Sequence, residues 1–326
     1  MEIDEKEEKL ETIDAILNDE IDLQEDDENV ETEVSASQNK FHVNAGEALY
    51  IDDIYTIAAK ECTKMMVLVG PVASGKTTIE TSIYQLFQNS PVEDFYFAGS
   101  YSLRGFEQRA FYTRLKSKGN EPQTQRTSLE DSQSFLHLRL FNKNSHIISN
   151  LIMADISGEA FTNHIGQVDE VKKSFPFIER ADYLVGVIDG EKLCNKKTRN
   201  SIVAEIIELV RTFSDADLIM DNCIFQVVFS KYDKLCKAEK LEEILEKAKK
   251  QIIGRLGELF TIIEFYKVAA MPSSTNEFKV GYGLDVLLQA WVKKRTCKSS
   301  METKEPFDRL TEYDRLYYKF LGDLNE

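Results

Sequence analysis

The sequence of 326 residues lacks several features that mark common classes of protein. No apolar run approaches the roughly 18 residues that a membrane-spanning helix needs. The N-terminus begins with acidic residues and has no apolar core segment, so we expect no signal peptide. No basic stripe stands out, and the sequence predicts no nucleic-acid binding. These absences favour a cytoplasmic protein that makes no use of a membrane.

Cysteine and histidine form no recognisable site. The five cysteines include no CxxC pair, which is typical of reduced thiols rather than of a disulfide framework or a zinc site. The four histidines are scattered and share no ligand spacing. The sequence therefore predicts neither a zinc centre nor a catalytic site that depends on histidine.

The net charge of −16 is concentrated near one end of the chain. Residues 1–40 contain sixteen acidic residues and three lysines, whereas the other residues contain 40 acidic and 37 basic ones. We expect residues 1–40 to form an acidic, mostly disordered tail. Apolar residues at helical spacing leave open a short amphipathic helix over residues 5–18 that docks on a partner.

Strands and helices alternate along the rest of the chain. Apolar runs predict strands at Met65–Val69, Ser134–Phe141, Ile147–Ala154, Tyr183–Ile188, Ile224–Phe229 and Ile262–Ala270. Helical patterns cover Ala48–Lys60, Thr77–Gln88, Leu103–Leu115, Thr198–Phe213, Leu241–Leu259 and Leu284–Lys294. The alternation predicts an α/β fold with a mostly parallel sheet covered on both faces. The second and third strands form an antiparallel hairpin, as in the sheet of a Ras-like P-loop GTPase.

A phosphate-binding loop follows the first predicted strand. The segment Gly70–Thr77 reads G-x-x-x-x-G-K-T, the Walker A pattern that lets backbone N–H groups surround phosphates. Lys76 is expected to reach the β- and γ-phosphates, and Thr77 to bind Mg²⁺. The predicted nucleotide-binding residues of this segment are Gly70, Ala73, Ser74, Gly75, Lys76, Thr77 and Thr78.

A second motif, D-I-S-G-E, begins at Asp155 directly after a predicted strand. Asp155 is expected to hold Mg²⁺ through water, and the amide of Gly158 to face the γ-phosphate. Glu159 stands where many GTPases place a water-positioning glutamine. A carboxylate there is repelled by the γ-phosphate unless it is paired or protonated, so both a catalytic and a structural role stay open.

A third motif, S-K-Y-D, contains Lys231 and Asp233 at the end of another predicted strand. A carboxylate accepts both hydrogen-bond donors on one edge of guanine, and it repels the acceptor that adenine presents there. Asp233 therefore predicts guanine recognition, with the stem of Lys231 along the base. Ala269 and Ala270 are expected to close over the base after the last strand.

A switch threonine that senses the γ-phosphate is expected between the first two motifs. Thr127 is the preferred candidate, with a further part in binding Mg²⁺, and Thr124 and Ser128 are alternatives. Arg126 is a candidate cis arginine finger, although a solvated loop arginine is the simpler interpretation. Residues 119–131 and 157–163 are predicted to be mobile loops. Arg104 and Arg109 could also reach the site, but they lie on a predicted helix and are more typical of surface charges.

Several segments together resemble the second type of bacterial double-GTPase. They are GEAL at 46–49, GPVASGKTT at 70–78, FAGSYSLRGFEQRA at 97–110, QRTS at 125–128, FLHLRL at 135–140, IMADISGEAF at 152–161, ADYLVGVIDGEKL at 181–193 and FSKYD at 229–233. The resemblance implies a Ras-like fold and a partner encoded nearby, such as a second GTPase, in prokaryotic defence systems. The F-E-Q-R segment at 106–109 would belong to an insert specific to the family. The family more often has T-K-W-D at Ser230–Asp233.

These observations predict a magnesium-dependent GTPase that acts as a molecular switch on GTP and GDP, slowly in the absence of a partner. A nucleotide-binding scaffold with little hydrolysis and a P-loop ATPase remain alternatives. The GTPase domain is expected to span residues 41–296, followed by a C-terminal tail or helix rich in aromatic residues at 297–326. The oligomeric state does not follow from the sequence.

Overall fold

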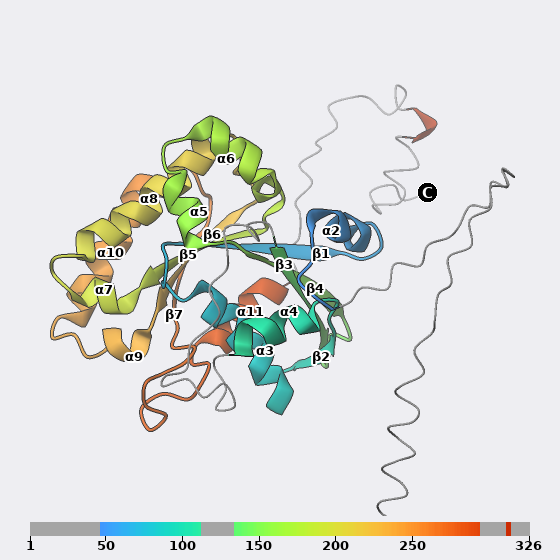
Figure 1. The fold of residues 1–326 in the computed structure, drawn as a ribbon, viewed down its shortest axis with the longest axis horizontal. Coiled ribbons are helices and arrows are strands. Elements are labelled where there is room, and N and C mark those ends of the chain that lie inside the picture. The colour runs from blue at the N-terminus through green and yellow to red at the C-terminus, as the bar shows by residue number, and fades with distance from the viewer. Residues whose placement is uncertain (1–45, 112–133, 294–310, 314–326) are drawn as a thin grey trace, which may run out of the picture. The chain divides into compact units, whose positions relative to one another are not determined.

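The computed structural model describes residues 46–111, 134–293 and 311–313. The described residues form a seven-stranded sheet in the order β2-β3-β4-β1-β5-β6-β7 (Figure 1). Its strands are β1 (Thr63–Val69), β2 (Phe95–Gly99), β3 (Ser134–Asn142), β4 (Ile148–Asp155), β5 (Tyr183–Asp189), β6 (Ile224–Ser230) and β7 (Ile263–Lys267). Neighbouring strands from β4 to β7 are parallel, whereas β3 is antiparallel to both β4 and β2. This order confirms the predicted α/β fold of a Ras-like P-loop GTPase.

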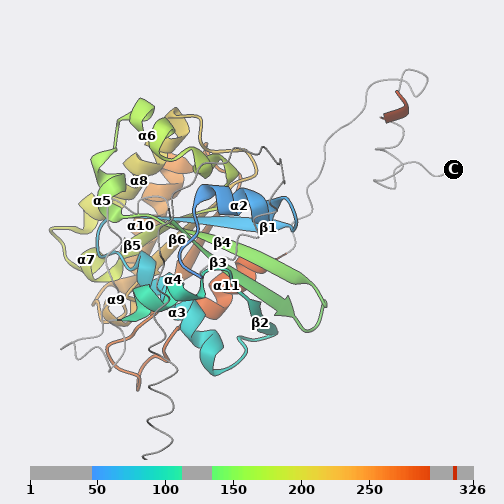
Figure 2. The ribbon, with the colours of Figure 1, turned by 45° about the vertical axis from the view of Figure 1, so that its right-hand side comes forward.

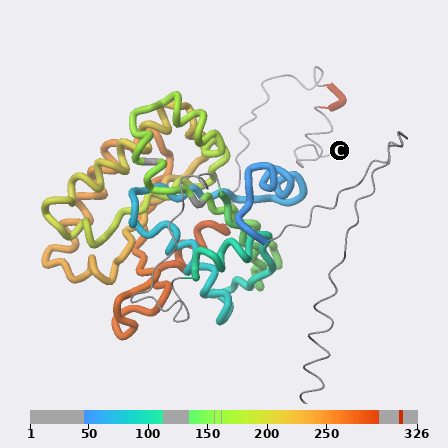
Figure 3. The backbone as a smooth tube through the Cα atoms, in the orientation of Figure 1, coloured from blue at the N-terminus to red at the C-terminus, as the bar shows by residue number. Residues whose placement is uncertain are grey.

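Helices cover both faces of this sheet (Figure 2). One face carries α3 (Lys76–Asn89), α4 (Leu103–Ala110) and α11 (Leu284–Val292). The other carries α2 (Ile51–Ala58), α5 (Gly158–Asn163), α6 (Val168–Ser174), α8 (Arg199–Asp215) and α10 (Leu241–Leu256). Shorter turns of helix are η3 (Pro176–Arg180), α7 (Gly190–Cys194) and α9 (Tyr232–Leu235). The backbone tube in Figure 3 shows α6, α8 and α10 grouped on one side of the sheet.

The central strand β1 explains why its sequence is apolar without alternation. Met65, Val67 and Val69 pack into the core on the α8 side, and Met66 and Leu68 pack on the α3 side. Both faces are therefore buried, which is the usual situation of a central parallel strand. The Walker A segment begins directly after this central strand ends at Val69.

The predicted elements are present with shifted ends, and two regions differ from expectation. Strand β2 was not predicted, and it extends the sheet beyond the hairpin of β3 and β4. The segment 157–163, predicted to be a mobile loop, is mostly the helix α5, because Ala160 is buried in the core and Thr162 Oγ1 donates to the carbonyl of Gly158 at 2.9 Å. The predicted strand Ile262–Ala270 ends at Lys267. The predicted loop 119–131 and both domain boundaries lie outside the described residues.

The carboxyl ends of β1, β4, β5, β6 and β7 lie at one edge of the sheet, because these strands are parallel. In open α/β sheets this is the edge at which ligands bind. Each predicted motif follows one of these strands, so the topology brings the motifs to a common edge. No helix in the described part of the chain has the length and apolar character needed to span a membrane.

Candidate functional site

The Walker A segment curls tightly between β1 and α3. Gly70 has φ of 155° and Gly75 has φ of 101°, and both values lie in the region that favours glycine. A Cβ atom at Gly70 would lie only 2.7 Å from the carbonyl oxygen of Val187. Ala73 also adopts a positive φ of 63°. The two glycines are therefore required by the path of the backbone, which closes into a cradle at the N-terminus of α3.

Lys76 and Ser74 direct polar groups into this cradle. The Lys76 ammonium donates to the carbonyl of Gly70 at 2.8 Å and to that of Pro71 at 3.3 Å, and the side chain is buried. The Ser74 hydroxyl is also buried and has no hydrogen-bond partner in the described part of the chain. A buried polar group without a partner is costly, so Ser74 is suited to a polar ligand in the loop.

The described residues that are predicted to bind Mg²⁺ lie at the start of α3 and at the end of β4. Thr77 and Thr78 are the second and third residues of α3, directly after Lys76. Asp155 is the last residue of β4, which runs parallel to β1 and brings its end beside the start of the loop. Gly158 packs directly on the loop, since a Cβ atom there would lie 2.5 Å from the backbone nitrogen of Val72. Only glycine fits this contact without a shift of the backbone.

Glu159 begins α5 immediately after this contact. Its backbone nitrogen donates to Ser157 Oγ at 3.3 Å, and its side chain is exposed. Glu159 forms no ion pair within the described residues. The exposed carboxylate is therefore free to move towards or away from a ligand.

Ser230 joins the S-K-Y-D segment, which is the predicted guanine motif, to the Walker A segment, which is the predicted phosphate loop. Its hydroxyl lies 2.6 Å from the carbonyl oxygen of Ser74 and 3.1 Å from that of Ile188. Ser230 is buried at the end of β6, and the next residue, Lys231, has φ of 49°. The chain therefore turns sharply at this point and starts α9 beside the Walker A segment.

Asp189 holds Lys231, and the sequence analysis did not single it out. Its Oδ2 lies 2.6 Å from the Lys231 ammonium, and its Oδ1 accepts from the backbone nitrogens of Glu191 and Lys192. The Asp189 side chain is buried, so the pair is shielded from water on that side. The aspartate that opens D-G-E-K is a recognisable N-cap signal, but its pairing with Lys231 depends on the tertiary fold.

Asp233 is held by a second residue that the sequence analysis missed. Its Oδ2 accepts from both the backbone nitrogen and the hydroxyl of Ser273, each at 2.9 Å. Ala269 and Ala270 are buried after β7, and the loop that they begin leads to Ser273. No local pattern signals this contact, because 40 residues separate the two partners.

The remaining candidates are the switch residues and two arginines on a helix. Thr127, its alternatives Thr124 and Ser128, and Arg126 lie outside the described residues. Arg104 is an exposed surface charge that pairs with Glu47 at 3.2 Å. Arg109, in contrast, is half-buried, so the surface interpretation holds for one of these two arginines only.

A buried polar network crosses the sheet beside β2. The His137 Nδ1 atom accepts from the backbone nitrogen of Tyr101 at 3.1 Å, so Nε2 carries the proton and donates to Asn150 Oδ1 at 3.2 Å. Burial lowers the pKa of His137, and Arg139 lowers it further, whereas the bond to Asn150 and the charge of Glu61 oppose the shift. The network therefore holds a neutral imidazole.

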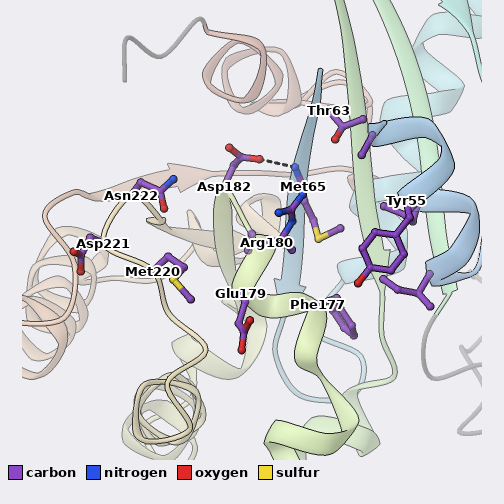
Figure 4. Close-up of a pocket in the computed structure, with 14 residues that line it drawn as sticks. Tyr55, Thr63, Met65, Phe177, Glu179, Arg180, Asp182, Met220, Asp221 and Asn222 are labelled. Atoms are coloured by element: carbon purple, nitrogen blue, oxygen red, sulfur yellow. Dashed lines mark hydrogen bonds between the residues drawn. The ribbon is translucent and has the colours of Figure 1, made fainter. Parts of the chain in front are cut away.

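A cavity of about 610 Å³ lies at the amino ends of the strands, away from the motifs (Figure 4). Thr63 at the start of β1, Asp182 before β5 and Asn222 before β6 contribute to its wall. Tyr55 of α2 and Arg180 of η3 also line it. None of the described residues predicted to bind the nucleotide lines this cavity.

The residues at the carboxyl edge suit a nucleoside triphosphate with a divalent cation. The loop supplies glycines where the backbone must approach a ligand closely, a buried ammonium, and the buried hydroxyl of Ser74 without a partner. Thr77 offers an oxygen ligand of the kind that Mg²⁺ prefers. Sheet order and loop positions together define the class of this protein as a P-loop GTPase fold.

Within this class, the chain belongs to a particular family. The model of the family described as Double-GTPase 2 matches residues 64–292, which is most of the chain. The chain is therefore a member of the double-GTPase family of the second type, and it is a GTP-binding protein. The match includes all of β1 except Thr63, the Walker A segment and every later strand of the sheet.

Comparisons with other proteins add little to this assignment. No curated protein matches the chain. A bacterial selenocysteine-specific elongation factor EF-Sec is 16% identical over 70% of this chain, with a TM-score of 0.34, and the chain spans 29% of that protein. The signal recognition particle receptor SRb-GTP/SRX complex from Chaetomium thermophilum is 13% identical over 66% of this chain and 94% of the other, with a TM-score of 0.37. The fold assignment depends on the sheet order rather than on these likenesses.

Proposed function

We propose that this protein binds GTP with Mg²⁺ and hydrolyses it, and that it acts as a molecular switch. The observation that supports this most strongly is that the D-I-S-G and S-K-Y-D segments each contact the Walker A segment. The guanine motif is bonded to the phosphate loop through Ser230 and Ser74, and Gly158 packs on Val72 of the same loop. These two contacts support a single site built from the three segments, which GTP recognition requires.

Each part of the site has a distinct task in this proposal. Lys76 and the loop amides bind the phosphates, and Asp233 reads the guanine edge while Lys231 lies along the base. Thr77 and Asp155 would hold Mg²⁺, which neutralises charge on the phosphate oxygens when it is bound. Gly158 presents its amide on the γ-phosphate side. Thr127 would complete the γ-phosphate sensor, with Arg126 as an accessory cation.

Hydrolysis is tested by phosphate release from GTP, measured for the parent chain and for Lys76→Ala. We expect the substitution to abolish release, because a buried ammonium that neutralises phosphate charge is lost. Lys196→Ala, at an exposed lysine, is the matched control and should behave like the parent. Equal rates for the parent and Lys76→Ala would rule out the hydrolase proposal.

Base specificity is tested with Asp233→Asn. Xanthine carries a carbonyl where guanine carries an amino group, so an amide at position 233 should favour xanthosine triphosphate over GTP. The contact with Ser273 orients this side chain in the parent, and it survives in part through the backbone nitrogen in the variant. If the preference between GTP and xanthosine triphosphate does not change, Asp233 does not read the base. The protein would then be a P-loop nucleotide-binding protein without guanine specificity, which would favour the ATPase alternative.

The exposed position of Glu159 supports a second candidate function, a GTP-dependent scaffold with little hydrolysis. An exposed carboxylate at the water-positioning place supplies no neutral amide to orient a water molecule. Intact GTP recovered from the purified protein after hours at 25 °C would favour the scaffold. Rapid conversion of the bound nucleotide to GDP would rule it out.

The family supports a proposal about the setting as well. Double-GTPases of this type imply a second GTPase or another protein encoded nearby, and a part in prokaryotic defence. The partner proposal is tested by a pull-down that measures how much of the protein encoded nearby binds to the GTP-loaded and to the GDP-loaded form of this protein. Binding that does not depend on the nucleotide would argue against a switch.

A further inference from the structure

The F-E-Q-R segment at 106–109 is not explained by nucleotide chemistry, and the structure gives it a clear mechanical role. The ring of Phe106 is fully buried and stacks on Tyr84 of α3 with centroids 4.8 Å apart. Glu107 Oε1 accepts from the Tyr84 hydroxyl at 2.7 Å and from Gln88 Nε2 at 2.9 Å. Helix α4 is therefore fastened to α3, the helix that begins at Lys76.

The start of α4 is held as firmly from another side. The backbone nitrogen of Gly105 donates to the carbonyl of Gly46 at 2.9 Å. A Cβ atom at Gly105 would lie 2.8 Å from the backbone nitrogen of Ala48, so the helix approaches this segment as closely as a glycine allows. Contacts on two sides thus fix both the position and the rotation of α4.

Arg109 extends from this fixed helix to the first residue of β3. Its Nη2 donates to Ser134 Oγ at 2.9 Å, and its Nη1 donates to the carbonyl of Gly105 at 3.1 Å. Ser134 is buried, and the arginine itself is half-buried. Two acceptors, one on β3 and one on α4, leave the planar guanidinium little freedom to reorient.

The position of Ser134 brings this charge to the phosphate side of the site. Ser134 is paired with Asp155 across the antiparallel ladder of β3 and β4. Asp155 opens the D-I-S-G motif, and three residues later Gly158 packs on Val72 of the phosphate loop. Paired residues in such a ladder have Cα atoms about 4.5–5.5 Å apart, so Arg109 lies beside the strand end that leads into the site.

We propose that Arg109 is a positioning residue of the nucleotide site. It fixes the ends of β3 and β4 where the D-I-S-G motif begins, and it adds a fixed positive charge on the phosphate side. A preorganised cation of this kind favours the nucleotide with more negative charge, so Arg109 strengthens binding of GTP relative to GDP. This inference rests on the proposed GTP-binding function.

The test measures dissociation constants for fluorescent GTP and GDP analogues with Mg²⁺ in the full chain. We expect Arg109→Gln to weaken GTP binding about tenfold, the scale of one lost charge-assisted interaction, and GDP binding about twofold or less. Arg104→Gln removes the same charge from the same helix at an exposed site and should leave the ratio unchanged. Arg109→Lys should retain part of the preference, because the charge stays while the two-point contact is lost.

Thermal unfolding of each variant separates positioning from simple stability. A lower melting temperature with an unchanged ratio of GTP to GDP affinity would overturn the inference. If Arg109→Gln does not fold, Ser134→Ala serves instead, since it keeps the charge and frees the guanidinium, and we expect a fall of about threefold in the ratio. An unchanged ratio in Ser134→Ala would then overturn the inference.

Failure of the inference and failure of the proposed function are distinguishable. A parent chain that binds neither nucleotide overturns the proposed function, and the inference falls with it. A parent that prefers GTP by the same factor as Arg109→Gln overturns the inference alone.

Discussion

Replacing Asp189 tests how the guanine motif is held, because this one buried carboxylate makes two kinds of contact. Its Oδ1 accepts from the backbone nitrogens of Glu191 at 2.9 Å and Lys192 at 3.3 Å, and so caps α7. Its Oδ2 pairs with the Lys231 ammonium at 2.6 Å. Asp189→Asn keeps an oxygen for the cap and removes the charge, whereas Asp189→Ala removes both.

The structure sets the size of each effect. Loss of a capping side chain costs about 1 kcal/mol. Breaking a fully buried ion pair costs about 3–5 kcal/mol. The Lys231 side chain is 31% exposed, however, so water replaces part of the lost interaction. We therefore expect a loss in the free energy of unfolding of about 1–2 kcal/mol for Asp189→Asn and about 2–3 kcal/mol for Asp189→Ala.

Urea unfolding of the parent and both variants measures these differences. Asp221→Asn, at an exposed carboxylate, is the control and should change the free energy by less than about 0.5 kcal/mol. With Lys231 along the base, as proposed, GTP affinity should fall in Asp189→Asn, because the ammonium is no longer held in place. Equal losses in Asp189→Asn and Asp189→Ala would refute the capping role, and a loss below about 0.5 kcal/mol in Asp189→Asn would refute the ion pair.

Three further predictions follow from other contacts. Gly158→Ala should lower the free energy of unfolding in urea by about 1–3 kcal/mol and weaken GTP binding. The reason is that the added Cβ would lie 2.5 Å from the backbone nitrogen of Val72. An unchanged free energy of unfolding would contradict a rigid contact at this position. Ser273→Ala should reduce the preference for GTP over ATP several-fold in competition binding, since Asp233 loses one of its two donors, and an unchanged preference would count against its role. The pKa of His137 is lowered in the folded chain, so the unfolded chain binds more protons just below the ordinary value of 6.5. Stability should therefore fall as the pH drops through that value, by at most about 1.4 kcal/mol per pH unit, and His137→Gln should flatten this part of the curve; identical curves would contradict the assignment.

Much of the fold could be predicted because its signals are local. The run Met65–Val69 is apolar throughout, since both faces of the central strand are covered, and the Walker A segment directly after it marks where the strand ends. The helical pattern over Leu241–Leu259 predicted α10, whose residues Ile244, Leu245 and Ile252 pack into the core.

Strand β2 and helix α5 were not predicted, for different reasons. Three of the five residues of β2 are exposed, since it lies at the edge of the sheet, and its sequence therefore lacks a clear apolar pattern. Helix α5 has only six residues and begins with glycine, so helical propensity argues against it. Its helical form depends on the packing of Ala160 in the core, which is a tertiary contact.

The residues of the proposed site also divide into those that local sequence predicts and those that depend on tertiary contacts. The Walker A, D-I-S-G and S-K-Y-D segments are recognisable because each binds a ligand group with backbone or side-chain atoms close in sequence. The residues that hold them in place are distant in sequence: Ser273 lies 40 residues from Asp233, and Asp189 lies 42 residues from Lys231. A single sequence carries no signal for such pairs.

The contact of Ser230 with Ser74 links the two halves of the proposed site. A hydroxyl donates only one proton, and Ser230 Oγ faces the carbonyl oxygens of both Ser74 and Ile188, so the shorter contact of 2.6 Å to Ser74 is the stronger candidate for the bond. This bond fixes the phosphate loop to the start of the guanine motif. Lys231 and Asp233 follow Ser230 in the same segment, so the bond lies next to the two residues predicted to contact the base. A single buried hydroxyl therefore links the segment predicted to bind phosphates to the segment predicted to read the base.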